Sequence, residues 1–304
     1  MMTSAVVSKT TAERGGQSDR RWWRSMEADE LVRRDVGSAT LALPRFLEDV
    51  TVYRFRDRND ADHELRASRL PASKSDLDAV IGRRRRELRA AFQPFGSASA
   101  ISSLPEARFS NRYFCLEARL GMNLALHVAA VVAWDELLLL EYDARERNDA
   151  VFSSVLRSLT AAPSRGAVEP GFARRSYGGY RLDVPAALAP PSQYAFEGRG
   201  LRLVADRGEL ELTRDDVAFE LGAEPGDELL VTDSPPLELA WDDFCANQRG
   251  FSVQLRDPER GAPQHFRVAR VTRQGELVLS LLAQAGPGAP ELDPLLRSTL
   301  LGIR

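Results

Sequence analysis

A stretch that occurs twice is the feature that most constrains how this chain can fold. The residues Gly37, Leu41, Pro44, Tyr53 and Phe55 return without a gap 141 positions later, as Gly178, Leu182, Pro185, Tyr194 and Phe196. A second set recurs at an offset of 140: Leu137, Leu139, Leu156, Arg157 and Ser158 match Leu277, Leu279, Leu296, Arg297 and Ser298. A unit of about 140 residues is a usual size for one hydrophobic core. The 304-residue chain is therefore predicted to form two tandem domains.

Composition sets the expected domain boundaries. Residues 1–36 begin with a stretch rich in Ser, Thr, Gly and charge, which predicts a flexible tail with a short helix running to about Arg34. The first domain is expected over 37–160, and the second, diverged domain over 173–304. Residues 161–172 between them contain two prolines and lack periodicity, as a linker does. In the tail, Trp22 and Trp23 either pack on the first domain or anchor a partner protein.

Short alternating strands and two helices are predicted in the first domain. Apolar residues at helical spacing predict a long helix from Ser73 to Phe92 and a closing helix from Asn148 to Leu159. Alternating runs predict antiparallel strands before the long helix and a four-strand meander between the helices. The expected fold class is thus α+β, with an antiparallel sheet packed against a long helix and a C-terminal helix. In the second domain the long helix is shortened, moved or lost, and a short helix is predicted near Leu239 to Asn247.

The sequence gives no support for catalysis or for a cofactor. His63, His127 and His265 all fall in predicted strands, and neither Cys115 nor Cys245 belongs to a metal-binding spacing. No glycine-rich phosphate loop follows a strand. The acidic pairs Asp215-Asp216 and Asp242-Asp243 are interpreted as turns or caps. We therefore predict no catalytic residue, no metal, no cofactor and no enzymatic activity.

Charge and hydropathy limit the expected partners. With 41 basic and 44 acidic residues the net charge is −3, which gives no electrostatic reason to bind nucleic acid. No apolar run is long enough for a secretory signal or a membrane span. These observations predict a cytoplasmic protein that does not insert into a membrane.

The order of elements resembles a known family. A strand ending in Leu43-Pro44, an Asp-x-Thr-Val-x-x-Phe strand beginning at Asp49, a long amphipathic helix, a four-strand meander and a closing helix together resemble the DcrB-like branch of the PsbP-like fold. The resemblance covers Gly37 to Leu159, and over Gly178 to Ile303 it holds only at the two ends. Cytoplasmic members of this family, the Eag-type chaperones, work as dimers and hold the apolar transmembrane helices of type VI secretion effectors. The resemblance implies that this chain is a self-contained pseudo-dimer with a chaperone or adaptor role.

Two other functions stay open beside the chaperone hypothesis. If an open sheet clasps an apolar helix, the candidate groove residues are Leu124, Leu126 and Val128 on one face of a strand, although the same residues could simply be core. An immunity protein that binds and inhibits a cognate toxin would instead use a polar, charge-complementary surface. A small-ligand-binding protein would need a pocket with convergent polar groups.

Overall fold

The computed structural model describes residues 31–303 except 61–62, 71–75, 106, 120–122, 135, 162–166, 214–215, 219–220, 225, 258, 260–261 and 287–291. The predictions for Trp22, Trp23 and the N-terminal tail up to residue 30 lie outside the described residues. The chain divides into two compact units. One comprises Asp49–Ala195, and the other combines the residues up to Glu48 with those from Phe196 onwards.

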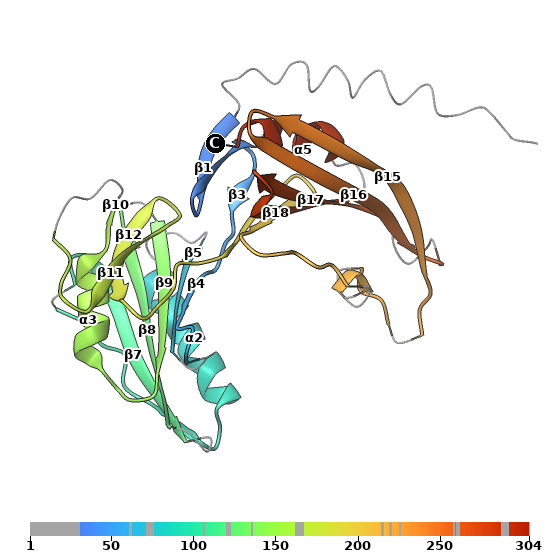
Figure 1. The fold of residues 1–304 in the computed structure, drawn as a ribbon. Coiled ribbons are helices and arrows are strands. Elements are labelled where there is room, and N and C mark those ends of the chain that lie inside the picture. The colour runs from blue at the N-terminus through green and yellow to red at the C-terminus, as the bar shows by residue number, and fades with distance from the viewer. Residues whose placement is uncertain are drawn as a thin grey trace, which may run out of the picture. The chain divides into compact units, whose positions relative to one another are not determined.

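The unit Asp49–Ala195 is built on a six-stranded antiparallel sheet. Its strands, in spatial order, are β4 (Tyr53–Arg56), β5 (Glu64–Leu70), β9 (Glu136–Ala144), β8 (Asn123–Ala133), β7 (Ser110–Arg119) and β6 (Gly96–Ala98). Both faces of this sheet are covered (Figure 1), so β8 is buried almost throughout.

Helix α2 (Leu77–Ala91) covers one face of the sheet, as its 3.6-residue periodicity predicts. Its buried residues Leu77, Val80, Ile81 and Leu88 pack in one cluster with apolar residues of β7, β8 and β9. Burial of a large aliphatic side chain contributes about 1.5–3 kcal/mol, so this seam stabilises the unit substantially.

The opposite face is covered by α3 (Asp149–Ser158) and by a hairpin of β11 (Phe172–Tyr177) and β12 (Tyr180–Pro185) (Figure 1). The short strand β10 (Thr160–Ala161) pairs with β12. The Asn148 side chain caps α3 by accepting a hydrogen bond from the Val151 amide at 3.1 Å. The Asp183 amide of β12 donates to the Ser158 hydroxyl at 2.7 Å, which ties the hairpin to the helix end.

The other unit carries a second antiparallel sheet. Its spatial order is β15 (Leu229–Trp241), β16 (Phe244–Leu255), β17 (Gln264–Arg273), β18 (Glu276–Ala285), β14 (Leu201–Asp206), β13 (Gln193–Gly198) and β3 (Glu48–Asp49). Helix α5 (Leu292–Leu301) packs on β17 and β18 and also on β2 (Ala39–Pro44), which forms a hairpin with β1 (Leu31–Val36).

The two sheets share one strand order. Read from β13 to β15, the order β13-β14-β18-β17-β16-β15 matches β4-β5-β9-β8-β7-β6 strand for strand. The repeated sequence also occupies equivalent hairpins, because Gly37 and Gly178 both lie in two-residue turns with positive φ. Two differences stand out between the sheets. The helix α2 has no counterpart of similar length among the described residues, and the three-residue strand β6 corresponds to the 13-residue β15.

Each unit contains the hairpin of the other sequence repeat. The β1–β2 hairpin belongs to the unit of α5, whereas β11–β12 belongs to the unit of α3. The units consequently divide at 48/49 and 195/196, not at the expected linker 161–172, although the sequence repeat itself still divides there.

The structure corrects two local predictions. Residues 31–34, predicted as the end of a helix, belong to strand β1. The helix predicted near Leu239 to Asn247 is wrong, since this segment is the end of β15, a turn at Asp242 with φ 48°, and the start of β16. Pairing with β16 and β17 outweighs the weak local helical pattern. Of the expected α+β fold, the antiparallel sheets are confirmed, in a chain with several such sheets and few helices. The arrangement as two tandem domains with a PsbP- or DcrB-like fold stays a prediction.

Candidate functional site

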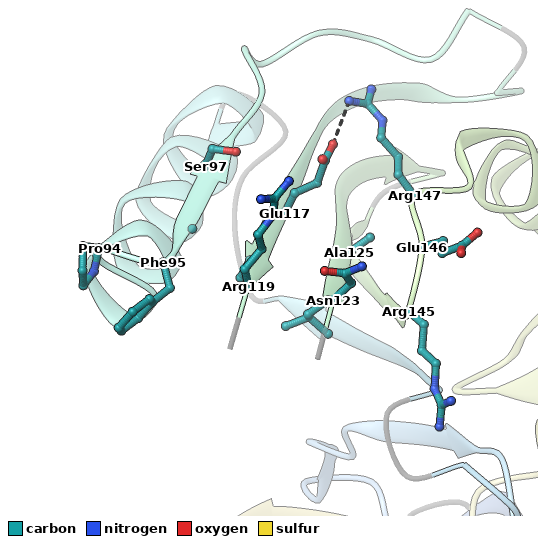
Figure 2. A pocket seen from close by; sticks show the side chains of 13 residues that line it. Pro94, Phe95, Ser97, Glu117, Arg119, Asn123, Ala125, Arg145, Glu146 and Arg147 are labelled. Carbon is teal, nitrogen blue, oxygen red and sulfur yellow. Dashed lines mark hydrogen bonds and ion pairs between the residues drawn. The ribbon is translucent and has the colours of Figure 1, made fainter. Parts of the chain in front are cut away.

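An open cleft of about 510 Å³ lies at one end of the six-stranded sheet (Figure 2). Its floor comes from the C-terminal end of β7 and the N-terminal end of β8. One wall is the segment Pro94–Ser97 after α2, and the other is Arg145–Arg147 between β9 and α3. Three segments distant in the sequence therefore meet here, because the antiparallel order brings these strand ends to one side of the sheet.

Charged side chains dominate the cleft. Arg147 bridges Glu117 at 3.3 Å and Asp149 at 2.8 Å, and Arg145 pairs with Asp60 at 3.0 Å. The Arg119 side chain is exposed and makes no ion pair or hydrogen bond with a described residue. Exposed pairs of this kind contribute only about 0–1 kcal/mol each to stability, so they are available to exchange partners on binding.

Two apolar groups complete the cleft. The Phe95 side chain is 57% exposed, and Leu124 is partly buried against the α2 cluster. An exposed ring beside the exposed Arg119, which has no ion pair among the described residues, is typical of the aromatic and arginine anchors in protein interfaces. The cleft can therefore accept a polypeptide loop that carries charge and one apolar side chain.

A buried histidine network lies between β7, β8 and α3. The Asn148 amide donates to His127 Nε2 at 3.1 Å, His127 Nδ1 lies 2.9 Å from the Tyr113 hydroxyl, and Tyr113 donates to Asp149 Oδ1 at 2.6 Å. The neutral imidazole with its proton on Nδ1 satisfies every one of these bonds. Burial lowers the pKa of His127 to about 4, and with both nitrogens occupied it has none free for a substrate. The network positions the start of α3.

The other candidate groups also lack a catalytic arrangement in the described part of the chain. His63 lies between Asp57 at 3.2 Å and the Tyr142 hydroxyl at 2.9 Å. Cys115 is buried, and burial raises the pKa of its thiol to about 11, which suppresses the reactive thiolate at neutral pH. No group of three or more His, Cys, Asp or Glu side chains able to hold a metal ion occurs among the described residues.

The acidic pairs behave as turn and cap residues where they are described. Asp216 accepts hydrogen bonds from the Thr213 amide at 2.9 Å and hydroxyl at 2.7 Å, whereas Asp215 lies outside the described residues. Asp242 and Asp243 form the turn between β15 and β16. None of the three described carboxylates, Asp216, Asp242 and Asp243, lines the cleft of the unit Asp49–Ala195.

The groove residues expected from the sequence lie in the core. Leu126 and Val128 are 2% and 0% exposed beneath α2, and Leu124 is partly buried against the same cluster. Their burial matches the alternative that the sequence left open, so Leu126 and Val128 are not available to a partner in this fold. Of the three, only Leu124 reaches the cleft.

Sequence reasoning missed a charged network on the α2 face of the sheet. Arg66 contacts Asp143 at 2.8 Å, and Arg84 of α2 contacts Glu141 at 2.6 Å. Glu64 accepts a hydrogen bond from the Arg56 side chain. Burial, with the neighbouring Glu64 and Glu141 charges, raises the pKa of Asp143 to about 6 against the opposing effect of Arg66. Charge at alternate positions of β5 and β9 was the available signal, but only strand pairing places these residues together.

The chain has similar structures among known proteins but matches no family model. A scan against family models found no match, and neither did a search of curated proteins. Among solved structures, the chain is similar to the immunity protein TplEi of the type VI secretion system from Pseudomonas aeruginosa, with 14% identity and a TM-score of 0.45 over 91% of this chain and 98% of that one. It is also similar to a chain of the Tle4–Tli4 complex, with 13% identity and a TM-score of 0.45 over 92% and 98%.

Among the described residues, no helix is long and apolar enough to cross a membrane.

Proposed function

We propose that this chain is a non-enzymatic immunity protein that binds a secreted toxin and blocks its active site. One observation carries the proposal. Leu126 and Val128, which would line the groove of a chaperone for apolar helices, are buried beneath α2, whereas charged side chains line the open cleft of the same unit.

The two roles make opposite demands on the surface. A chaperone for transmembrane helices needs a contiguous exposed apolar area, whereas a protein that recognises a folded toxin needs complementary charge. In the described part of the unit Asp49–Ala195, the exposed large apolar residues are Val50, Val52, Phe95, Ile101, Trp134 and Val168. They come from separate segments, and only Phe95 lines the cleft. The surface chemistry of the unit Asp49–Ala195 therefore favours inhibition over helix shielding.

The cleft suits a loop of a folded partner. Arg119 offers a guanidinium that has no ion-pair or hydrogen-bond partner among the described residues, Glu146 adds an exposed carboxylate, and Phe95 adds exposed apolar area to the same cleft. Arginine binds carboxylates through two parallel hydrogen bonds, which favours an acidic side chain of the toxin at this point. Binding of such a loop occludes the toxin surface around it.

We take a type VI secretion effector as the class of toxin because the sequence resembles proteins that accompany such effectors. The immunity role is the one named for TplEi. Because both TM-scores lie below 0.5, we base the choice between inhibitor and chaperone on the surface of this chain alone.

Co-expression with the toxin encoded in the neighbouring large open reading frame tests the proposal. We expect the chain to suppress toxicity and to copurify with the toxin's catalytic domain after any apolar N-terminal helices of the toxin are deleted. Loss of the complex on that deletion would return the chaperone hypothesis to first place. The absence of any complex would overturn both roles and favour a ligand in the cleft.

A matched pair of charge reversals locates the binding site. Arg119→Glu, in the cleft, is expected to weaken the complex by about thirtyfold or more, since hot-spot arginines contribute at least about 2 kcal/mol. Arg89→Glu, at an exposed position of α2, makes the same charge change outside the cleft. Equal effects of the two variants would show that the cleft is not the interface.

A further inference from the structure

The strand β15 forms an unusually long open edge. It pairs only with β16 among the described strands, and no described backbone hydrogen bond joins its outer side to another segment. The equivalent edge strand of the other sheet, β6, has three residues, whereas β15 has 13. An unpaired edge presents a row of amide and carbonyl groups that another strand can extend.

Two apolar side chains of β15 are exposed on opposite faces of the sheet. Leu230 and Val231 point to opposite faces because successive residues of a strand alternate, and they are 51% and 55% exposed. Leu229, at the start of the strand, instead packs partly against the cluster of Val217, Val253 and Phe266. An added strand would therefore find one exposed apolar side chain on each face.

A proline pair limits where a strand can add. Pro235 and Pro236 lack amide protons, and the register with β16 shifts between Ser234 and Leu237. Such an interruption protects an edge against indiscriminate pairing. It leaves Leu229–Ser234 as the regular stretch with a free outer side.

The sequence around β15 carries an excess of negative charge. Between Arg214 and Arg249 it has no basic residue and ten acidic ones: Asp215, Asp216, Glu220, Glu224, Asp227, Glu228, Asp233, Glu238, Asp242 and Asp243. Asp233 and Glu238 lie on β15 itself and are exposed, and Glu228 precedes the strand. Two arginines reach this stretch, since Arg256 pairs with Glu228 and Arg267 Nη1 donates to the Ser234 hydroxyl at 3.2 Å. The remaining negative excess favours a basic segment over an acidic one at this edge.

From the free edge, the exposed apolar pair and the excess of negative charge, we propose that Leu229–Ser234 binds an extended basic segment of the partner protein as an added strand. Backbone hydrogen bonds to the outer side of β15 supply the affinity. Lysine or arginine opposite Asp233 supplies the selectivity, since opposite charges across a strand pair attract. The proposed function enters only in naming the toxin as the natural source of that segment.

A synthetic strand of alternating lysine and valine, capped at both ends, probes the edge on the full chain. We expect its binding, followed by fluorescence anisotropy, to exceed that of a matched peptide with glutamate in place of lysine. Amide hydrogen exchange should slow across residues 229–234 when the lysine peptide binds. Slowing of backbone exchange marks strand addition, which a contact through side-chain charge alone would not produce.

Two exposed charge reversals complete the test. Asp233→Lys should raise the dissociation constant of the lysine peptide about fivefold, the equivalent of about 1 kcal/mol for a lost cross-strand charge pair. Glu276→Lys, at the exposed first residue of β18, should leave it nearly unchanged. No binding, equal binding of both peptides, or binding without protection at 229–234 would each overturn the proposal. These outcomes do not depend on the toxin co-expression result, so the two proposals can fail separately.

Discussion

Protonation of the buried His127 side chain should lower the free energy of unfolding of its unit in acid. The imidazole is 0% exposed, and its Nε2 accepts the amide hydrogen of Asn148. A second proton on the ring would point at that amide and break the bond, in a site that also penalises the charge by burial. The neighbouring Asp149 favours the charge and Arg147 opposes it, but burial is the largest effect.

The sign and size follow from the difference between the folded and unfolded pKa values. The folded pKa is about 4 against an ordinary value of 6.5, so between these limits the unfolded chain binds more protons than the folded one. Stability is therefore complete above pH 6.5 and falls as the pH drops toward 4. The loss is about 2.5 pH units at about 1.4 kcal/mol each, or about 3 kcal/mol.

Urea unfolding at a series of pH values from 7.5 to 4 measures this loss in the parent and in His127→Gln. The glutamine variant should be less stable at neutral pH, yet its free energy of unfolding should lack the parent's decline below pH 6.5. The pKa of Asp143 is raised to about 6. Protonation of this carboxyl therefore makes the fold more stable as the pH falls, which is the opposite of the His127 effect. Its effect is common to both proteins and cancels in the difference between them.

Two results would refute this reasoning. One is an equal pH dependence of stability in parent and variant between pH 4 and 6.5. The other is a His127 ring that titrates near 6.5 by NMR, which would mean that the hydrogen bond from the Asn148 amide does not hold the ring in its neutral form.

Three further predictions test the packing. Gly198→Ala places a Cβ 2.3 Å from the Phe46 carbonyl oxygen, so thermal unfolding should show a loss of about 1–3 kcal/mol; an unchanged melting temperature would contradict the close approach. Phe114→Ala empties a fully buried site and should cost about 3–5 kcal/mol in urea unfolding; a cost below 1 kcal/mol would place the ring outside the core. Cutting the chain within 162–166 should give two pieces that fold only when co-expressed, since each unit needs the other repeat's hairpin; a piece that folds cooperatively alone would argue against the exchange.

Local patterns in the sequence were sufficient for helices α2 and α3 and for the hairpin turns. Helix α2 could be predicted because Val80, Ile81 and Leu88 recur at the helical period, and α3 because Asn148 precedes an apolar stripe. The recurrence of Gly37 as Gly178 marked two equivalent hairpins, since both turns require a positive φ. The burial of Val128 also agrees with the interpretation of its strand as core, which was one of the two left open beside a binding groove.

The candidate sites depended on pairing between distant segments. The cleft joins Phe95, Arg119 and Arg147 from three parts of the chain, and the network of Glu64 and Glu141 exists only because β5 pairs with β9. The segment 239–247 misled the prediction for the same reason, since its conformation is set by pairing with β16 and β17.

The sequence by itself showed the repeat directly, and it determined the helical periods and the turn positions because these two depend on interactions between residues close together in the chain. Only the tertiary structure decided that the hairpins are exchanged between repeats, that β15 has a free edge and that the predicted groove is core. These properties depend on which of several compatible strands and faces meet. That choice is made by packing over the whole unit, where many local patterns are satisfied equally well by more than one partner.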